Sequence, residues 1–310
     1  MKLVGQSGKT ARLPARPRGR YGVALAALMV AALGTACGSG EGGRPATKPE
    51  KPKTGSGAQG GAPALTPQQQ RQALVAATKK WRLAKVPLTA PAAPTTKPEI
   101  TTRDGFEVED HEELGLPPVF TTIPTEENVV FLTIDDGAEK DPEFLKMMKE
   151  LKIPYTAFVS DYVIRDNYAY FKEMQASGVT INNHTLNHRY MPALSYEKQR
   201  QEICGQQNTI HKEFGKAPTL FRPPYGNYNE DTLKAAKSCG IKYAPLWNAE
   251  AFPDKMDYRE WDRDLHPGDI ILTHFRGRED WKGTMPDMIR QVMKTVTDKG
   301  YAVARLEDYL

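Results

Sequence analysis

The sequence predicts an α/β fold over residues 117–310, with a parallel sheet and helices packed outside it. Short apolar runs alternate with longer amphipathic segments through this region, which implies strands joined by crossover helices. Several apolar runs also end in charged or imidazole side chains. In such folds the chemistry lies at the carboxyl ends of the strands. The alternation fits an open sheet as well as one closed into a barrel.

Local patterns place the individual elements. The apolar run 129–134 is the first expected strand, and Asp141 and Pro142 then supply a cap and a first residue for a helix. Gly178 ends a later helix, and the turn 267–269 precedes a late strand. We expect strands at 129–134, 155–159, 179–182, 220–222, 244–247, 270–273 and 302–304, and helices at 141–151, 168–177, 195–214, 229–239 and 285–299.

The first 36 residues predict a secretory signal peptide. Six basic side chains precede an uncharged, mostly apolar stretch that is shorter than the roughly 20 residues of a membrane-spanning helix. The run Leu-Gly-Thr-Ala-Cys at 33–37 resembles the bacterial lipobox, with Gly where Leu is usual, which implies lipidation of Cys37. We therefore expect an extracytoplasmic lipoprotein anchored to the cell membrane. The alternative is cleavage near Ala36 and secretion, with Cys37 incidental.

Residues 37–65 predict a flexible linker, because Gly, Pro, Lys, Ser and Ala without an aromatic residue cannot bury enough apolar surface to fold. An extension follows at 66–116, which is partly helical and rich in Pro and Thr. Its expected helix covers 66–85, with Thr66 as the cap and Pro67 as the first helical residue. The compact domain then covers 117–310.

The formal charge of +4 comes from residues 1–36, which hold six basic and no acidic side chains and leave the rest at about −2. This remainder offers no basic surface for nucleic acid, and we expect a monomer. Cys204 and Cys239 either form a disulfide, as an exported protein allows, or are buried thiols on separate helices.

Polar side chains follow four of the expected strands. Asp135 and Asp136 end the first strand, and His184 and His188 follow the third. The run 222–226, Arg-Pro-Pro-Tyr-Gly, ends another strand, and His274 ends the strand 270–273. Because the carboxyl ends of parallel strands meet at one rim, we expect these groups to converge.

His184 and His188 suggest a metal site. Their spacing of four places both rings on one face of a helical turn, although a capping or surface pair has the same spacing. Adjacent aspartates are costly to bury unless a cation or an arginine compensates them. Neighbouring residues of a strand point in opposite directions, so Asp135 and Asp136 can take different roles. Arg222 is the candidate that holds the base ionised.

These motifs resemble the polysaccharide deacetylase family, the NodB-homology domain of carbohydrate esterase family 4. The resemblance covers about 190 residues, and the first motif has Ile134 where the family usually has Phe. It implies a distorted (β/α) barrel of about seven parallel strands with outer helices. The matching runs are Leu-Thr-Ile-Asp-Asp-Gly at 132–137, His-Thr-Leu-Asn-His at 184–188, Arg-Pro-Pro-Tyr-Gly at 222–226 and Leu-Thr-His at 272–274.

The resemblance also implies a role for each motif residue. Asp136, His184 and His188 would bind a divalent metal ion, usually zinc, and Asp135 would be the general base that Arg222 orients. The remaining roles are an oxyanion donor, the backbone N–H of Tyr225; a general acid, His274; and a pocket wall for the acetyl methyl, Leu272.

The fourth motif of the family departs here. Its usual Asp-rich stretch followed by Asp-Trp is replaced by Trp-Asn-Ala-Glu-Ala-Phe-Pro-Asp at 247–254. Trp247 or Phe252 is then the candidate for the pocket wall. Glu250 or Asp254 is the candidate partner of His274.

The expected activity is metal-dependent removal of N-acetyl groups from an aminosugar polysaccharide, cell-wall peptidoglycan or a chitin-like oligosaccharide. One alternative is an O-deacetylase such as an acetylxylan esterase, because an alcohol leaves more easily than an amine. Another is a non-catalytic lipoprotein that binds glycans, which the altered fourth motif suggests.

Overall fold

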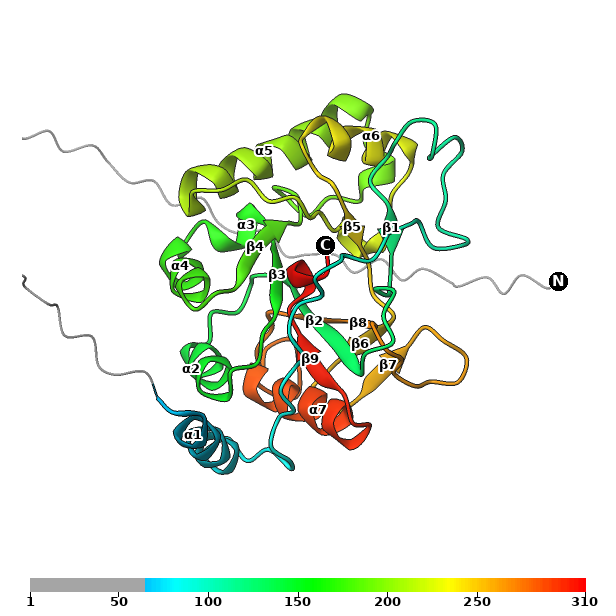
Figure 1. Ribbon diagram of the computed structural model, residues 1–310. Coiled ribbons are helices and arrows are strands. Elements are labelled where there is room, and N and C mark those ends of the chain that lie inside the picture. Colours follow the sequence, from blue (N-terminus) through cyan, green and yellow to red (C-terminus); the bar gives the residue numbers. More distant parts are fainter. Residues whose placement is uncertain (1–64) are drawn as a thin grey trace, which may run out of the picture. The chain divides into compact units, whose positions relative to one another are not determined.

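The strand β2 (Val129–Asp136) lies at the centre of the sheet in the computed structural model, which describes residues 65–310 (Figure 1). All eight of its residues are buried, as is typical of a parallel strand covered on both faces. Its neighbours are β3 (Thr156–Val159) and β8 (Ile270–His274), and both run parallel to it. This arrangement confirms the predicted α/β fold.

The sheet has the order β4-β3-β2-β8-β6-β7, and β9 also pairs with β2. Every pairing in it is parallel except that of β6 with β7. A separate parallel pair joins β1 and β5, and single bridges at 220–221 connect β4 to the segment before β5, so the ring is irregular. The bounds are β1 Val119–Phe120, β4 Thr180–Asn183, β5 Ala244–Pro245, β6 Ala249–Ala251, β7 Met256–Tyr258 and β9 Ala302–Ala304.

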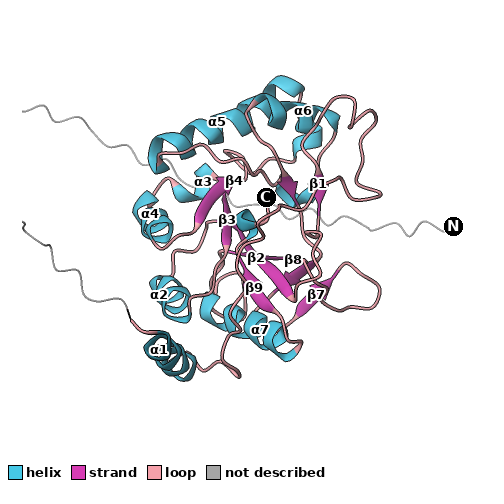
Figure 2. Cartoon of the chain, in the orientation of Figure 1, coloured by secondary structure: helices cyan, strands magenta, loops and turns pink. Residues whose placement is uncertain are grey.

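Helices surround the strands, as Figure 2 shows. Asp141 caps the first of them by accepting a hydrogen bond from the N–H of Glu143 at 2.9 Å, and Pro142 follows it. The predicted cap and first residue are therefore confirmed. The helices of the barrel are α2 Pro142–Leu151, α3 Asp161–Ile164, α4 Tyr168–Ala176, α5 Tyr196–Phe214, α6 Glu230–Ser238 and α7 Met285–Asp298, with 3₁₀ turns η1 Met191–Ala193, η2 Pro224–Gly226 and η3 Leu306–Asp308.

Two expected strands are shorter than predicted. Of residues 220–222, only Leu220 and Phe221 form isolated bridges, without a ladder, and the strand expected at 244–247 is reduced to Ala244–Pro245. Prolines explain both differences, because Pro223, Pro224 and Pro245 have no N–H to donate to a neighbouring strand.

The extension before the barrel carries α1 (Pro67–Lys80), which packs against α2. The predicted cap Thr66 is confirmed, but the helix ends five residues before the expected end. Arg82 lies just past it with a φ of 57°, which a right-handed helix does not allow. Trp81 is buried beyond the helix end, and its indole N–H donates to Glu150 at 2.7 Å.

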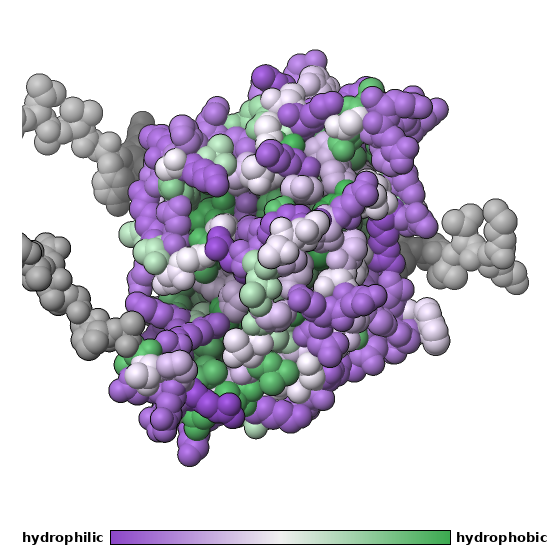
Figure 3. All heavy atoms as spheres, viewed as in Figure 1, coloured by the Kyte–Doolittle hydropathy of each residue, from purple (hydrophilic) through white to green (hydrophobic). Residues whose placement is uncertain are grey.

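The predicted signal peptide 1–36, Cys37 and most of the linker 37–65 lie outside the described residues. Among residues 65–310, none of the helices is both long and apolar enough to cross a membrane. Figure 3 shows one face of the molecule, on which hydrophilic residues predominate and apolar residues appear in patches between them.

Cys204 of α5 and Cys239 after α6 form a disulfide, with their Cα atoms 5.1 Å apart. Of the two alternatives that the sequence allowed, the structure confirms the disulfide. The bond closes a loop with a sequence separation of 35 residues.

Replacing both cysteines by alanine is expected to lower the free energy of unfolding by about 3–4 kcal/mol, because the unfolded chain regains the freedom that the closed loop removes. Chemical denaturation of the oxidised protein and of the double variant measures this difference. Equal transition midpoints would contradict a stabilising role for the bond.

Candidate active site

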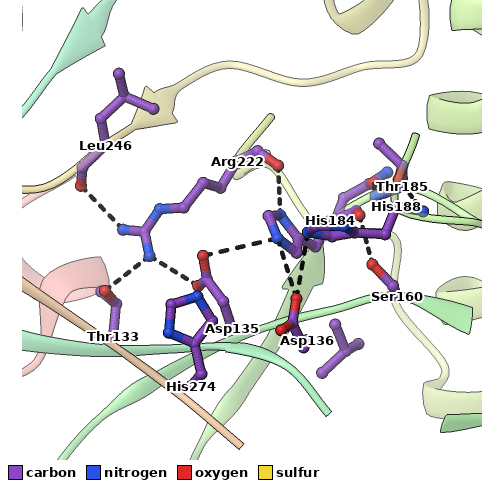
Figure 4. Close-up of polar contacts among 12 residues, drawn as sticks. Thr133, Asp135, Asp136, Ser160, His184, Thr185, His188, Arg222, Leu246 and His274 are labelled. Carbon is purple, nitrogen blue, oxygen red and sulfur yellow. Dashed lines mark hydrogen bonds and ion pairs between the residues drawn. The ribbon is translucent and has the colours of Figure 1, made fainter. Parts of the chain in front are cut away.

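The polar residues at the four strand ends meet at one rim of the barrel (Figure 4). Asp135 is paired in register with His274, so the ends of β2 and β8 lie side by side. His184 follows β4, and the peptide N–H of Arg222 bonds to the carbonyl of Asn183 at 3.0 Å. The convergence predicted from the sequence is therefore observed for these residues.

Asp136, His184 and His188 form a candidate metal site. One ligand atom from each lies within 4.8 Å of the others. The Oδ1 atom of Asp136 is 3.6 Å from Nε2 of His184 and 3.3 Å from Nε2 of His188. That oxygen is buried and accepts no hydrogen bond from any residue of the described chain. A buried carboxylate oxygen without a donor is costly unless a cation completes it.

Both imidazoles are in the form that binds metals. Nδ1 of His184 lies 2.7 Å from the carbonyl oxygen of Arg222, so this nitrogen carries the proton and leaves a lone pair on Nε2. Burial lowers the pKa of His184 and of His188 to about 4, which keeps both rings neutral near pH 7. One carboxylate and two neutral imidazoles are a donor set that suits zinc, so the residues fit a divalent cation.

The loop that carries the two histidines is not the helical turn that their spacing predicted. Thr185 and His188 have φ values of 69° and 51°, outside the right-handed helical region. Local side chains hold this shape: Asn183 accepts from the N–H of Thr185 at 2.9 Å, and the Thr185 hydroxyl accepts from the N–H of His188 at 3.0 Å. The imidazole centroids are nevertheless 4.8 Å apart.

Asp135 is held by Arg222, whose side chain is fully buried. Nη1 of Arg222 donates to Asp135 at 2.8 Å and to the Thr133 hydroxyl at 2.8 Å. Its other nitrogens donate to the carbonyls of Pro245 and Leu246. Burial raises the pKa of Asp135 from 3.8 to about 6, although Arg222 and His274 oppose the rise. The carboxylate is thus a stronger base than an exposed one.

Asp136 differs from Asp135 in the direction of its pKa shift and in its backbone conformation. Burial alone would raise its pKa, but His184, His274, His188 and Arg276 together hold the pKa below its ordinary value. The two aspartates do not point in opposite directions as predicted, since Nε2 of His184 is within 3.7 Å of both carboxylates. The reason is that Asp136 has a φ of 76°, which ends the alternation of the strand.

His274 lies beside Glu250, with 3.7 Å between Nδ1 and Oε1. β6 pairs with β8 and brings Glu250 level with Leu272, two residues before the imidazole. Asp254 is exposed and forms no ion pair within residues 65–310, so of the two candidate partners the structure places Glu250 next to His274. Burial lowers the pKa of His274, while Asp135 and Asp136 act to raise it.

Tyr225 has left-handed backbone angles, φ 62° and ψ 7°, and the residue is 61% exposed. Its peptide N–H has no acceptor in the described part of the chain. The adjacent Gly226 lies against the ring of Trp247. A free N–H on a turn fixed in this way is available to a ligand.

The other candidate wall residues lie in different surroundings. Leu272 is buried and belongs to the same face of β8 as His274. Phe252 instead packs edge-on against Trp281, with 6.3 Å between ring centroids. Leu272 thus shares a strand face with a site residue, whereas Phe252 has Trp281 as its aromatic neighbour.

Three residues near the site were not identified from the sequence. Nη2 of Arg276 is 3.3 Å from Oδ2 of Asp136, and the Ser160 hydroxyl donates to the carbonyl of His184 at 2.6 Å. The ring of Tyr162 lies 6.5 Å from that of His188. Ser160 directly follows β3, and Arg276 lies two residues after β8. The position of a polar residue at a strand end was the sequence signal available for both.

Comparison with known proteins assigns a family. A family model described as polysaccharide deacetylase matches residues 122–244. An uncharacterized protein of Streptomyces coelicolor is 39% identical over 196 residues, which are 63% of this chain and 78% of that protein. The peptidoglycan-N-acetylglucosamine deacetylase of Bacillus cereus is 26% identical over 202 residues, 61% of this chain and 91% of that protein.

Solved structures agree with this assignment. A family 4 carbohydrate esterase from Bacillus anthracis superposes with a TM-score of 0.52 and 26% identity, over 71% of this chain and 98% of that one. The predicted distorted barrel is thereby confirmed. From its motifs, its fold and these relatives, the chain belongs to the polysaccharide deacetylase family, carbohydrate esterase family 4.

Proposed function

We propose that this deacetylase hydrolyses N-acetyl groups of an aminosugar polysaccharide, with a divalent cation, zinc by its donor set, held by Asp136, His184 and His188. The observation that carries the proposal is the buried, unpartnered Oδ1 of Asp136 between two neutral imidazoles. A cation there supplies a Lewis acid and acidifies water. The other site residues supply the proton transfers and the hydrogen bonds.

Asp135 is the general base in this scheme. Its pKa of about 6 is close to the neutral range in which a carboxylate accepts a proton from water most effectively. Arg222 fixes the direction of the carboxylate through the 2.8 Å hydrogen bond and uses its remaining donors on the backbone. The base is therefore aimed before substrate binds.

The free N–H of Tyr225 donates to the oxyanion that forms when the amide carbonyl is attacked. His274 donates a proton to the departing amine, which leaves poorly without it. Glu250 at 3.7 Å favours the protonated imidazole that this step needs. Leu272 forms the wall against the acetyl methyl group.

Glu250→Gln is expected to lower kcat about tenfold and to move the alkaline limb of the pH profile to lower pH. Loss of the carboxylate lowers the pKa of His274, so the acid is deprotonated earlier as the pH rises. The exposed Asp254→Asn is the matched control and leaves the profile unchanged. An unshifted limb in Glu250→Gln would show that Glu250 does not tune His274.

We place the substrate in the cell wall. The match to the peptidoglycan-N-acetylglucosamine deacetylase of Bacillus cereus covers 91% of that protein. The lipidation expected at Cys37 would hold the enzyme outside the cytoplasmic membrane, close to peptidoglycan. The alternative is a secreted enzyme that acts on a chitin-like oligosaccharide. The polymer from which the enzyme releases acetate distinguishes the two.

Acetate release from peptidoglycan, chitooligosaccharides and acetylxylan tests the proposal. We expect release from the N-acetylated polymers and strong loss in His274→Ala. Release from acetylxylan alone, insensitive to His274→Ala, would instead establish an O-deacetylase. Binding of all glycans without acetate would establish a glycan-binding protein.

A further inference from the structure

The segment 99–116, here called the strap, precedes the barrel and contacts the segments that flank β6 and β7. The peptide N–H of Arg103 bonds to the carbonyl of Val119 at 2.8 Å, and the Tyr228 hydroxyl donates to the carbonyl of Phe106. Val108 and Leu116 pack against a buried cluster that includes Leu246. The strap is therefore attached to the barrel along most of its length.

Arg103 connects the strap to the segments on either side of β6 and β7. Its Nη1 donates to Thr121 at 2.5 Å and to the side chain of Asn248 at 3.1 Å. Its Nη2 forms an ion pair with Glu260 at 2.5 Å. One guanidinium thus fixes the residue after Trp247 and the residue after Arg259.

Phe106, Arg259, Trp247 and Arg222 form a series of cation–π contacts that leads from the strap to the catalytic base. The Arg259 guanidinium lies 5.4 Å from the ring of Phe106 and 5.6 Å from that of Trp247. Nε of Arg259 also donates to the carbonyl of Trp247 at 3.1 Å. The Arg222 guanidinium is 5.8 Å from the same indole ring. Such contacts favour one arrangement of the ring and the guanidinium.

The indole of Trp247 packs against the tight turn that carries Tyr225. A Cβ added at Gly226 would lie 2.9 Å from the Trp247 ring, so the turn and the indole are in close contact. Tyr225 has a φ of 62°, and a non-glycine residue keeps such a conformation only when its surroundings impose it. The indole is the part of the surroundings that the strap holds in place.

We propose that Phe106, through Arg259, and Arg103, through Asn248 and Glu260, are positioning residues that hold Trp247 and thereby fix the Tyr225 N–H for the oxyanion. The inference assigns a role in catalysis to a segment that contains none of the family motifs. It rests on the proposed deacetylation, because the oxyanion belongs to that reaction. Displacement of a preorganised donor by a fraction of an ångström slows the reaction without weakening substrate binding.

Phe106→Leu tests this role, because leucine keeps the partly buried apolar contact and removes the aromatic face. We expect kcat to fall about tenfold while KM changes less than twofold, and Phe106→Tyr to restore kcat. Leu83→Ala is the control. Leu83 lies in the same extension and is buried in the core cluster that also contains Trp81. We expect this substitution to lower stability without lowering kcat.

Hydrogen exchange of the segment 222–228 supplies a readout that needs no substrate. We expect faster exchange there in Phe106→Leu and unchanged exchange in Leu83→Ala. Unchanged kcat and exchange in a folded Phe106→Leu protein would overturn the inference, as would a raised KM at constant kcat. If the unmodified protein releases no acetate, the proposed function fails, whereas the exchange comparison still decides whether the strap holds the turn.

Discussion

Asp135→Asn is expected to lower kcat by about 10²–10⁴ and to remove a loss of stability that the metal-free parent protein shows as the pH rises from about 4 through 6. The first effect follows from loss of the general base. The second follows from burial, which raises the pKa of Asp135 to about 6. A folded pKa above the unfolded one means that ionisation opposes folding, so stability falls as pH rises from about 4 through 6. Asparagine cannot ionise, so Asp135→Asn removes the stability loss that ionisation of Asp135 causes.

Thermal unfolding of the metal-free proteins between pH 4 and 8 measures the second effect. The parent protein should lose stability over the lower half of this range relative to Asp135→Asn. Glu143→Gln changes an exposed carboxylate of α2 paired with Lys146 and serves as the control with no effect on kcat. An Asp135→Asn protein with unchanged kcat would remove Asp135 from the mechanism.

Arg222→Leu is expected to lower the free energy of unfolding by about 3–5 kcal/mol, because it leaves the buried Asp135 without its partner. The Pro245 and Leu246 carbonyls also lose their donors. The double variant Arg222→Leu/Asp135→Asn should recover part of the loss, since the uncompensated charge is then absent. Denaturant unfolding of both single variants and of the double variant gives this coupling.

The exposed Arg71→Leu is the matched control for Arg222→Leu and should change the free energy of unfolding by less than about 0.5 kcal/mol. If Arg222→Leu were equally mild, the buried pair would not hold the rim together. If the double variant were no more stable than Arg222→Leu, the loss would arise from the backbone carbonyls.

The parts of the fold that repeat a pattern were predictable. The apolar run of β2 and the Asp141-Pro142 helix start follow from local chemistry. The positions of Asp135, Asp136, His184, His188 and His274 follow from the rule that parallel strands end at one rim. What these predictions have in common is that each depends on the backbone period or on the strand direction alone.

The parts that depend on contacts between distant segments were not predictable. The loop from His184 to His188 adopts left-handed angles that its side-chain hydrogen bonds impose, which residue spacing does not reveal. The choice of Glu250 over Asp254 depends on the register of β6 against β8. The contacts of Phe106 with Arg259 join segments about 150 residues apart and leave no local pattern in the sequence.

Metal dependence is tested most directly by acetate release from N-acetylated peptidoglycan before chelation, after chelation and after zinc is restored, with metal content measured at each stage. We expect about one zinc ion bound per chain at the start, loss of acetate release with loss of the metal, and recovery of both on addition. In Asp136→Ala neither the metal nor the activity should return. Undiminished acetate release from metal-free protein would contradict the account.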